Sequence, residues 1–238
     1  MEKSAYNLIE ILITLVLLGI ISVIVIPNLI KKYQRTITVT KVKRFYANIT
    51  DAYSQYIILN GNSVPDLSVE YPRTSEGAQK MYNDLIKPYF EISYDAGVDT
   101  QRKSIIMDNS AIKLLNGSNY ANYTSNNLYY GYQFKDGATG WVRGHGKGLA
   151  IAYDVNGKKG PNTLGKDLFI FSINDVNNTE VSPYDQTSGR MTLKEAAEAQ
   201  CKNKNAKGWH CASWIIAQGN MNYLDCTNLA DWTTGKCK

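Results

Sequence analysis

Side chains that carry oxygen gather in one glycine-rich stretch of the sequence, between positions 154 and 167. Asp154, Asn156, Asn162 and Asp167 lie there among three glycines. Carboxylate and amide oxygens are the ligands that hard cations such as calcium prefer, and calcium takes about six to eight of them. The stretch differs from an EF-hand loop, because Lys158 stands where a third acidic or amide ligand belongs and no glutamate closes the loop.

Two interpretations of this stretch stay open. In the first, the four oxygen-bearing residues bind calcium, which would be the one cofactor of the chain. In the second, Asp154 and Asn156 accept hydrogen bonds from backbone amides in a tight turn, and Gly157 adopts a positive φ. The second is favoured on sequence alone, because Lys158 and Lys159 weaken the affinity of the stretch for a cation.

All four cysteines lie in the last 38 residues, at positions 201, 211, 226 and 237. An even number of cysteines clustered in a loop-rich tail is typical of disulfides in an oxidising compartment, with three possible connectivities. We favour the sequential pairing Cys201–Cys211 and Cys226–Cys237. Each bond would close a loop of about ten residues and stabilise the fold by roughly 2–3 kcal/mol.

Zinc is the competing use of these cysteines. His210 stands next to Cys211 and would offer a further ligand. The spacings are far from the C-x-x-C pairs of structural zinc sites, so the disulfide interpretation is preferred.

The sequence predicts no catalytic residues. His145 lies in the glycine-rich stretch Gly144–Gly148, which lacks the Lys-Ser/Thr ending of a phosphate loop and is predicted to be a flexible turn. His210 fits a packed or surface side chain. Asp51 and Asp84 have no visible partner that would fix an acid–base geometry. We therefore do not expect an enzyme; a membrane-anchored hydrolase would need a nucleophile or a perturbed acid in a cleft.

Glu10 is the one acid in an otherwise apolar run from Leu8 to Ile26. Such a run is long enough to span a bilayer as a helix. A charged side chain costs roughly 2.5–3.5 kcal/mol at the centre of a membrane helix, and less near an end, so an acid there is expected to have a partner and a function.

The residues around Glu10 resemble the prepilin signature. Positions 5–12 read AYNLIEIL, in the family's order of a small residue, an aromatic residue, Thr, Leu, a hydrophobe and Glu. The chain is thus similar to type IV pilins and type II secretion pseudopilins over residues 5–30, and in its long helix to residue 60. Ala5, Tyr6 and Asn7 replace the usual Gly, Phe and Thr.

The resemblance implies a pathway of processing and assembly. A prepilin peptidase would cleave between Ala5 and Tyr6 on the cytoplasmic side and methylate the new amine of Tyr6. Glu10 would pair with the amine of a neighbouring subunit in the filament, and Pro27 lies where the family's helix is kinked or locally melted. The implied partners are the peptidase, other pilin or pseudopilin subunits, the inner-membrane assembly machinery and membrane lipid.

The family's fold is α+β and ladle-shaped, with a small antiparallel sheet and a disulfide-stapled C-terminal region. It implies a leader at 1–5, a transmembrane and assembly helix at 6–60, and a globular head at 61–238 outside the cytoplasm. The protein would reside in the bacterial inner membrane and then in a periplasmic or extracellular filament.

Periodicity supports a helix that continues past the membrane. Gly61, Asn62 and Pro65 are expected to end it. Apolar residues recur at three- and four-residue steps and would form one buried face; they are Val42, Phe45, Tyr46, Ile49, Tyr53, Tyr56 and Ile57.

Shorter elements are expected beyond the long helix. Ser75 is the predicted N-cap of a helix that reaches Phe90. A capping box, Thr192 with Glu195, begins a helix to Cys201, and Gly219 ends a helix that begins at Cys211. Strands that would form an antiparallel meander are predicted at 128–134, 149–155 and 168–173.

The distribution of charge conflicts with the implied topology. The chain carries a net charge of +5, and six basic residues follow the apolar run without an acid among them. By the positive-inside rule the C-terminal body would be cytoplasmic. We override that inference because the processing site and the cysteines favour the opposite orientation. The basic residues, which suit lipid headgroups better than nucleic acid, are Lys31, Lys32, Arg35, Lys41, Lys43 and Arg44.

The alternative to a filament subunit is a single-pass anchor that presents a binding or adhesin domain without polymerising. A secretory signal peptide fits less well, because its cleavage site follows the apolar region, whereas the processing-like site at Ala5 precedes it. Removal of the leader is the observation that separates the filament subunit from the anchor.

Overall fold

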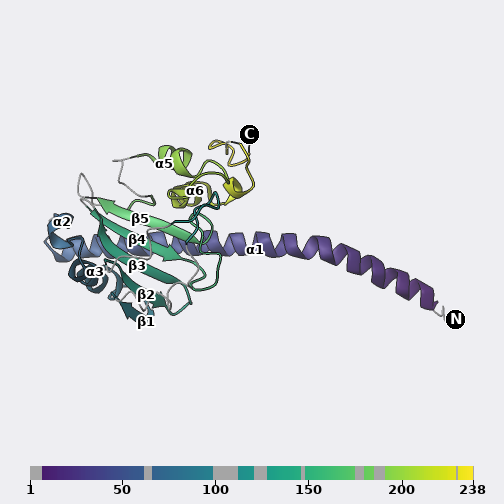
Figure 1. Cartoon of the computed structure of the whole chain (residues 1–238), viewed down its shortest axis with the longest axis horizontal. Helices are drawn as coiled ribbons and strands as arrows, with labels where there is room; N and C mark the ends of the chain where they lie inside the picture. The colour runs from purple at the N-terminus through teal and green to yellow at the C-terminus, as the bar shows by residue number, and fades with distance from the viewer. Residues whose placement is uncertain are drawn as a thin grey trace. The chain divides into compact units, whose positions relative to one another are not determined.

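The computed structural model describes residues 7–61, 66–98, 112–120, 128–145, 148–174, 180–184, 191–228 and 230–237. The fold is α+β, and the chain divides into two compact units, residues 1–37 and 38–238. Helix α1 (Leu8–Leu59) contributes to both units (Figure 1). The boundary between the units therefore lies inside α1. The expected leader at 1–5 lies outside the described residues.

The first unit contains the apolar part of α1. Pro27 stands inside the helix, which continues through it without a break. Proline has no N–H to donate to the preceding turn. The next residue, Asn28, donates from its side-chain Nδ2 to the carbonyl oxygen of Ile24, one turn earlier, at 3.0 Å. The helix is continuous at Pro27, where the prepilin resemblance implies a kink or local melting, and the role of Pro27 in assembly stays a prediction.

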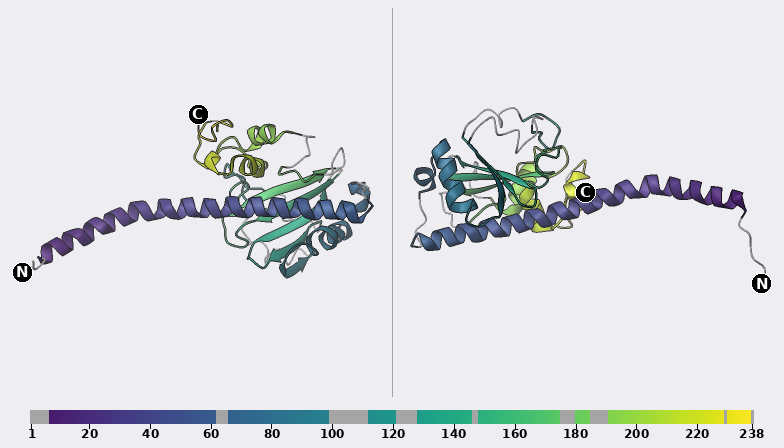
Figure 2. Two further views of the ribbon diagram at one scale, coloured as in Figure 1. Left: turned by 180° about the vertical axis from the view of Figure 1, so that it is seen from behind. Right: turned by 90° about the horizontal axis from the view of Figure 1, so that it is seen from below.

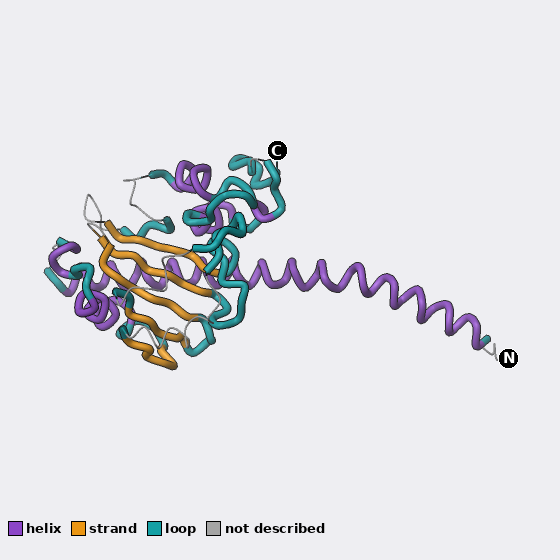
Figure 3. The backbone as a smooth tube through the Cα atoms, in the orientation of Figure 1, coloured by secondary structure: helices purple, strands orange, loops and turns teal. Residues whose placement is uncertain are grey.

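The second unit is built on a five-stranded antiparallel sheet with its strands in sequence order, a meander that Figure 3 traces in orange. The predicted strands at 128–134, 149–155 and 168–173 are confirmed within one or two residues of their bounds; two further strands were not predicted. The five are β1 (Ile92–Gly97), β2 (Tyr130–Phe134), β3 (Thr139–His145), β4 (Gly148–Asp154) and β5 (Leu168–Asn174).

The turn predicted at Gly144–Gly148 is too long. Gly144 and His145 belong to β3, Gly148 begins β4 and pairs with His145, and positions 146 and 147 lie outside the described residues. A β-carbon on Gly144 would lie 2.3 Å from the carbonyl oxygen of Tyr71. The glycine is there because another segment of backbone packs against the strand, which the sequence does not reveal.

One face of the sheet is covered by residues 38–59 of α1, which run across the strands in the left view of Figure 2. The Phe45 ring stacks on Tyr153 of β4 at 4.3 Å between centroids and contacts Phe171 of β5 at 5.1 Å. The predicted apolar face of the helix is thus confirmed, with Tyr46 and Ile57 only partly buried. Its buried members are Val42, Phe45, Ile49, Ala52, Tyr53 and Tyr56.

The opposite face of the sheet carries a second, smaller core. Trp141 of β3, Ala152 of β4 and Ile170 of β5 point to this face and are buried with Ile112 and Leu164. The strands therefore have side chains buried on both faces, which is why their sequences lack a clean alternation of apolar and polar residues.

Two short helices precede the sheet. Asp66 caps α2 (Leu67–Glu70), and α3 (Ser75–Met81) runs into a π-helical turn, η1 (Tyr82–Ile86). The predicted N-cap Ser75 is wrong by one residue. The cap is Thr74, whose Oγ1 accepts a hydrogen bond from Gly77 N at 3.1 Å. The α-helix also ends earlier than predicted, because its last turn widens where Lys87 N donates to the Tyr82 carbonyl oxygen at 2.9 Å.

The C-terminal region agrees with its prediction. Thr192 and Glu195 form the capping box of α5 (Leu193–Gln200). Helix α6 (Cys211–Gln218) lies beside β5 and ends at Gly219, which adopts a left-handed φ of 67°. These elements depend on contacts between residues close in sequence, which is why the sequence predicts them well.

Candidate functional site

The apolar part of α1 exposes its side chains to the surroundings. An 18-residue window of the helix has a mean hydropathy of 3.0, and none of that window is buried. Large apolar side chains between positions 8 and 30 are exposed by 43% (Val25) to 78% (Leu8). A soluble domain rarely leaves so large an apolar surface uncovered. This part of α1 is long and apolar enough to cross a membrane and is compatible with a membrane anchor.

Glu10 lies in the first turn of this exposed helix. It is the only charged residue between positions 8 and 30. Its Oε2 atom accepts a hydrogen bond from the backbone N–H of Asn7 at 3.2 Å, which satisfies one of the free donors at the helix start. The proposed processing site, Ala5 and Tyr6, lies outside the described residues, so its geometry relative to Glu10 is not part of the site.

The four cysteines form two disulfides, Cys201–Cys211 and Cys226–Cys237. This is the sequential pairing that the sequence favours. No free thiol is left to hold zinc. His210 is buried, and its Nδ1 atom lies 3.1 Å from the Ala196 carbonyl oxygen, a packed setting. The disulfides are compatible with a domain outside the cytoplasm.

The loop between β4 and β5 brings together the four oxygen-bearing residues that the sequence singles out. Asp154, Asn162 and Asp167 are exposed by only 0%, 0% and 5%. Asp154 Oδ1 accepts hydrogen bonds from the backbone N–H groups of Asn156 at 3.1 Å and of Gly157 at 3.0 Å. The predicted tight turn therefore exists, and Gly157 has the expected positive φ, 62°.

Asp167 is held by donors from the loop itself. Its Oδ2 atom accepts from Asn162 N at 3.0 Å and from Asn156 Nδ2 at 3.3 Å. Its Oδ1 atom accepts from Thr163 N. Three donors on one carboxylate fix the positions of both asparagines, so Asp167 organises the loop.

The Asn162 amide closes the loop onto Asp154. Its nitrogen donates to Asp154 Oδ2 at 3.2 Å and to the Gly157 carbonyl oxygen at 3.3 Å, the orientation in which both ends of the amide are satisfied. Asn156 Oδ1 is buried and accepts no hydrogen bond among the described residues.

Burial of two carboxylates in one loop changes their acidity. The pKa of Asp154 is raised to about 8, chiefly because burial disfavours the charged form and secondly because Asp167 is near. Burial also raises the pKa of Asp167, against the opposing effect of its hydrogen bonds. Within the described ranges, neither carboxylate forms an ion pair, and no three His, Cys, Asp or Glu residues group together as metal ligands.

The loop rests on two neighbours that are distant in sequence. A β-carbon on Gly157 would lie 2.4 Å from the carbonyl oxygen of Gly137, in the turn between β2 and β3. Lys41 of α1 donates to the Val155 carbonyl oxygen at 3.2 Å and pairs with Asp136 at 3.0 Å. Sequence reasoning missed both supports, because contacts between residues 20 (Gly137 and Gly157) and 114 (Lys41 and Val155) positions apart leave no local signal.

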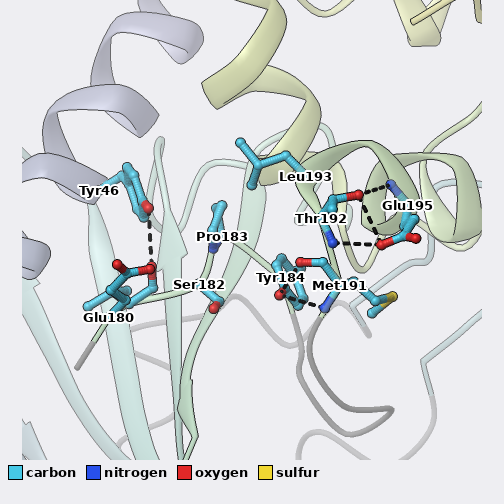
Figure 4. A pocket seen from close by; sticks show the side chains of 10 residues that line it. Tyr46, Glu180, Ser182, Pro183, Tyr184, Met191, Thr192, Leu193 and Glu195 are labelled. Carbon is cyan, nitrogen blue, oxygen red and sulfur yellow. Dashed lines mark hydrogen bonds between the residues drawn. The ribbon is translucent and has the colours of Figure 1, made fainter. Parts of the chain in front are cut away.

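A separate pocket of about 540 Å³ lies between α1, the segment after β5 and α5 (Figure 4). Its polar groups bind one another: Tyr46 donates to the Val181 carbonyl oxygen at 3.1 Å, and Thr192 is tied to Glu195 at 2.9 Å. Burial and Glu180 raise the pKa of Tyr46, so the phenol keeps its proton at neutral pH. These groups join segments of the fold, and their arrangement shows no nucleophile next to a base.

The two histidines have different neighbours. The His210 ring lies 5.8 Å from the ring of Tyr184, which lines the pocket. His145 Nδ1 is 3.0 Å from Arg143 Nη2, and Arg143 in turn covers the ring of Tyr129 at 4.5 Å. This group sits on the sheet face opposite α1. Its contacts are those of packed side chains.

Comparisons with family models, with curated proteins and with solved structures return no match for this chain. The site must therefore be interpreted from its own chemistry.

Proposed function

We propose that the chain is a pilin-like subunit that is anchored in a membrane by the first part of α1 and polymerises through that helix. The observation that carries the proposal is Glu10, a single carboxylate in a surface that is otherwise apolar from position 8 to position 30. A lone acid in such a surface is retained for a partner, since apolar residues would serve anchoring better.

Filament cohesion would come from burial of the exposed apolar side chains among neighbouring helices. Burial is favourable by about 25 cal/mol for each Å² removed from water, so the helix is unstable in water and stable in lipid or in a helical bundle. In the bundle, Glu10 would pair with the amine that cleavage between Ala5 and Tyr6 creates on an adjacent subunit. A buried charge tolerates such a site only when it is paired.

The second unit fits the head of such a subunit. Residues 38–59 of α1 are buried against an antiparallel sheet, and two disulfides fasten the C-terminal region. This arrangement within the second unit supports the proposal of a pilin-like head outside the cytoplasm. The partners would be a prepilin peptidase, further pilin-like subunits, the inner-membrane assembly machinery and lipid.

A second candidate function is a membrane anchor that does not polymerise. The hydrogen bond from Asn7 N to Glu10 Oε2 favours it, because an acid near the start of a helix can be retained as a local cap. On this interpretation Glu10 needs no second subunit.

The variant Glu10→Gln separates the two functions. Glutamine keeps an oxygen that can accept from Asn7 N but lacks the charge needed to pair with an amine. We expect Glu10→Gln to lower filament yield about tenfold or more, as loss of an ion pair worth at least about 1.4 kcal/mol per subunit requires, while the level of protein in the membrane is unchanged.

The measurements are sheared-filament yield and the intact mass of the membrane form. Leu12→Ala is the matched control on the same helix, and it should polymerise. Normal filaments from Glu10→Gln would overturn the pairing role of Glu10. Wild-type protein that keeps residues 1–5 and forms no filaments would instead establish the anchor.

A further inference from the structure

We propose that the pocket between α1, the segment after β5 and α5 is a contact between subunits, in which Glu180 and Glu195 receive the Lys32 side chain of a second copy of this chain. The pocket lies wholly within the second unit. The inference rests on the proposed function and deepens it, because it names the surface by which the head of one subunit binds the helix of another.

The lining of the pocket combines an apolar wall with two carboxylates. Figure 4 shows Glu180 beside Tyr46 and Glu195 beside Thr192, on opposite sides of the view. None of the described residues that line the pocket is basic. The volume of about 540 Å³ falls within the range of about 300–1,000 Å³ that is usual for ligand sites. The remaining wall is largely apolar and includes Val181, Pro183, Tyr184, Met191 and Leu193.

The hydroxyl groups of the lining are already occupied. Tyr46 donates to the Val181 carbonyl oxygen at 3.1 Å. The Tyr184 hydroxyl donates to the Met191 carbonyl oxygen at 2.6 Å and accepts from Met191 N at 3.0 Å. Thr192 Oγ1 donates to Glu195 at 2.9 Å. A neutral polar ligand therefore gains little here, and the carboxylates and the apolar wall are what the pocket offers.

Both carboxylates have oxygens to spare. Glu180 is exposed and forms no ion pair or hydrogen bond among the described residues. Glu195 uses Oε2 for Thr192 and leaves Oε1 without a hydrogen bond in the described part of the chain. A lysine or arginine side chain suits this combination, because an apolar stem carries its charged end. The ligand class is therefore a basic side chain.

The chain itself carries the complementary charge. Six basic residues lie between positions 31 and 44, and no acid lies between Asn28 and Thr50. Burial of the preceding apolar helix among parallel copies brings these like charges together, which opposes association unless acids from elsewhere face them. The acids of the pocket belong to the head, so they can meet the basic segment only on another subunit if each helix is enclosed by its neighbours.

Lys32 is the member of this segment whose charge the structure leaves unanswered. It is exposed and forms no ion pair or hydrogen bond among the described residues. Lys41 pairs with Asp136 at 3.0 Å. Lys43 lies against the end of α6, where a β-carbon on Gly219 would be 3.2 Å from its Nζ atom. The other three have contacts or a neighbouring ring within their own chain; they are Lys31, Arg35 and Arg44.

Zero-length cross-linking tests the contact directly. Filaments of the full chain are sheared from cells and treated with a carbodiimide, which joins a carboxylate to an amine without a spacer. The band that contains two linked chains is digested and mapped by mass spectrometry. We expect a peptide pair that joins Glu180 or Glu195 to Lys32. A map in which these two glutamates are joined to other lysines or remain unmodified overturns the proposal.

Charge reversal gives the functional test. Glu180→Lys and Lys32→Glu should each lower the yield of sheared filaments about tenfold or more, because like charges that meet at an interface suppress association, while the level of protein in the membrane is unchanged. The double variant should recover to within about threefold of wild type, since the two substitutions share one contact. Glu198→Lys is the matched control, because Glu198 is an exposed acid of α5 that does not line the pocket.

The outcomes separate this contact from the proposed function. Wild-type filaments together with normal filaments from Glu180→Lys, or a double variant that recovers nothing, overturn the contact and leave the filament proposal in place. A wild type that forms no filaments overturns both.

Discussion

Two neighbouring turns in the head use the same chemistry and differ in what surrounds it. Asp136 Oδ1 accepts from Ala138 N at 3.1 Å in the turn between β2 and β3, as Asp154 Oδ1 accepts from Asn156 N after β4. Each turn also contains a glycine with positive φ, Gly137 at 85° and Gly157 at 62°. The Asp136 side chain is 51% exposed and pairs with Lys41. Asp154 is fully buried and forms no ion pair among the described residues.

The difference in exposure between Asp136 and Asp154 shows that the turn motif alone does not account for the burial of Asp154. Both aspartates shape their turns with one oxygen, and solvent and Lys41 neutralise the charge of Asp136. Asp154 has neither, although the hydrogen bonds that make its turn are as good. A feature that is costly and unnecessary for folding is a candidate for function.

Replacing the positive-φ glycine of each turn by alanine should give the largest difference in the free energy of unfolding between the two turns. Gly137→Ala meets no atom within 4 Å and suffers only from its positive φ, so we expect a loss of about 1–2 kcal/mol. Gly157→Ala has the same backbone penalty and places its β-carbon 2.4 Å from the Gly137 carbonyl oxygen, which adds about 1–3 kcal/mol of overpacking. Denaturant unfolding of the two variants measures both losses. Equal losses would mean that the turns are not in contact.

The pH dependence of stability should also distinguish the two aspartates. Asp154 has a pKa of about 8 in the folded state, against about 3.9 when unfolded, so the folded state loses stability as the pH rises from about 4 through 8. Asp167 and Lys166 face the same region and stay in the variant. We therefore expect Asp154→Asn to be more stable than wild type at pH 8 by roughly 1–3 kcal/mol.

The same comparison at pH 4 should show little difference, because Asp154 is then protonated in the folded state and still about half protonated in the unfolded state. Asp136→Asn should not change the slope of stability against pH. Thermal melts across pH 4–9 provide the measurement, and a wild-type slope that persists in Asp154→Asn would show that this carboxyl is ionised without cost.

Removal of the ion pair at the exposed turn should have the smallest effect. Lys41→Met keeps the apolar stem and loses the contacts to Asp136 and to the Val155 carbonyl oxygen. Exposed pairs contribute about 0–1 kcal/mol, so unfolding of this variant should shift by no more than about 1.5 kcal/mol, including the hydrogen bond. A larger loss would identify Lys41 as the main tie between α1 and both turns.

Local patterns predict much of the fold. The buried face of α1, the capping box at Thr192 and the left-handed Gly219 all follow from residues within one or two helical turns of each other. The strands β1 and β3 were not predicted, because no local sequence pattern marks them. β1 is largely exposed and irregular in its pairing with β2, and β3 is buried on both faces and contains glycines that only tertiary contacts explain.

The sequence predicts which residues make up the candidate site, but it does not predict how deeply each of them is buried. The sequence identifies Asp154, Asn156, Asn162 and Asp167 as oxygen ligands around a turn, but it favours the turn alone because two lysines are adjacent. The lysines are exposed and the two aspartates buried, a separation that depends on how the loop packs against Gly137. Burial of this kind is set by residues far away in the chain and cannot be derived from the loop.

The two disulfides have a consequence for the route by which the tail is oxidised. Their cysteines are 10 and 11 residues apart, whereas each of the other two connectivities closes larger loops. Since the entropy of loop closure grows with the logarithm of loop length, random closure of the unfolded tail favours the native pairing roughly tenfold over either alternative. The order of the cysteines along the chain thus favours the correct partners once both bonds have formed, whereas for the first bond alone the native loops are favoured only about twofold over the loop that Cys211 and Cys226 would close.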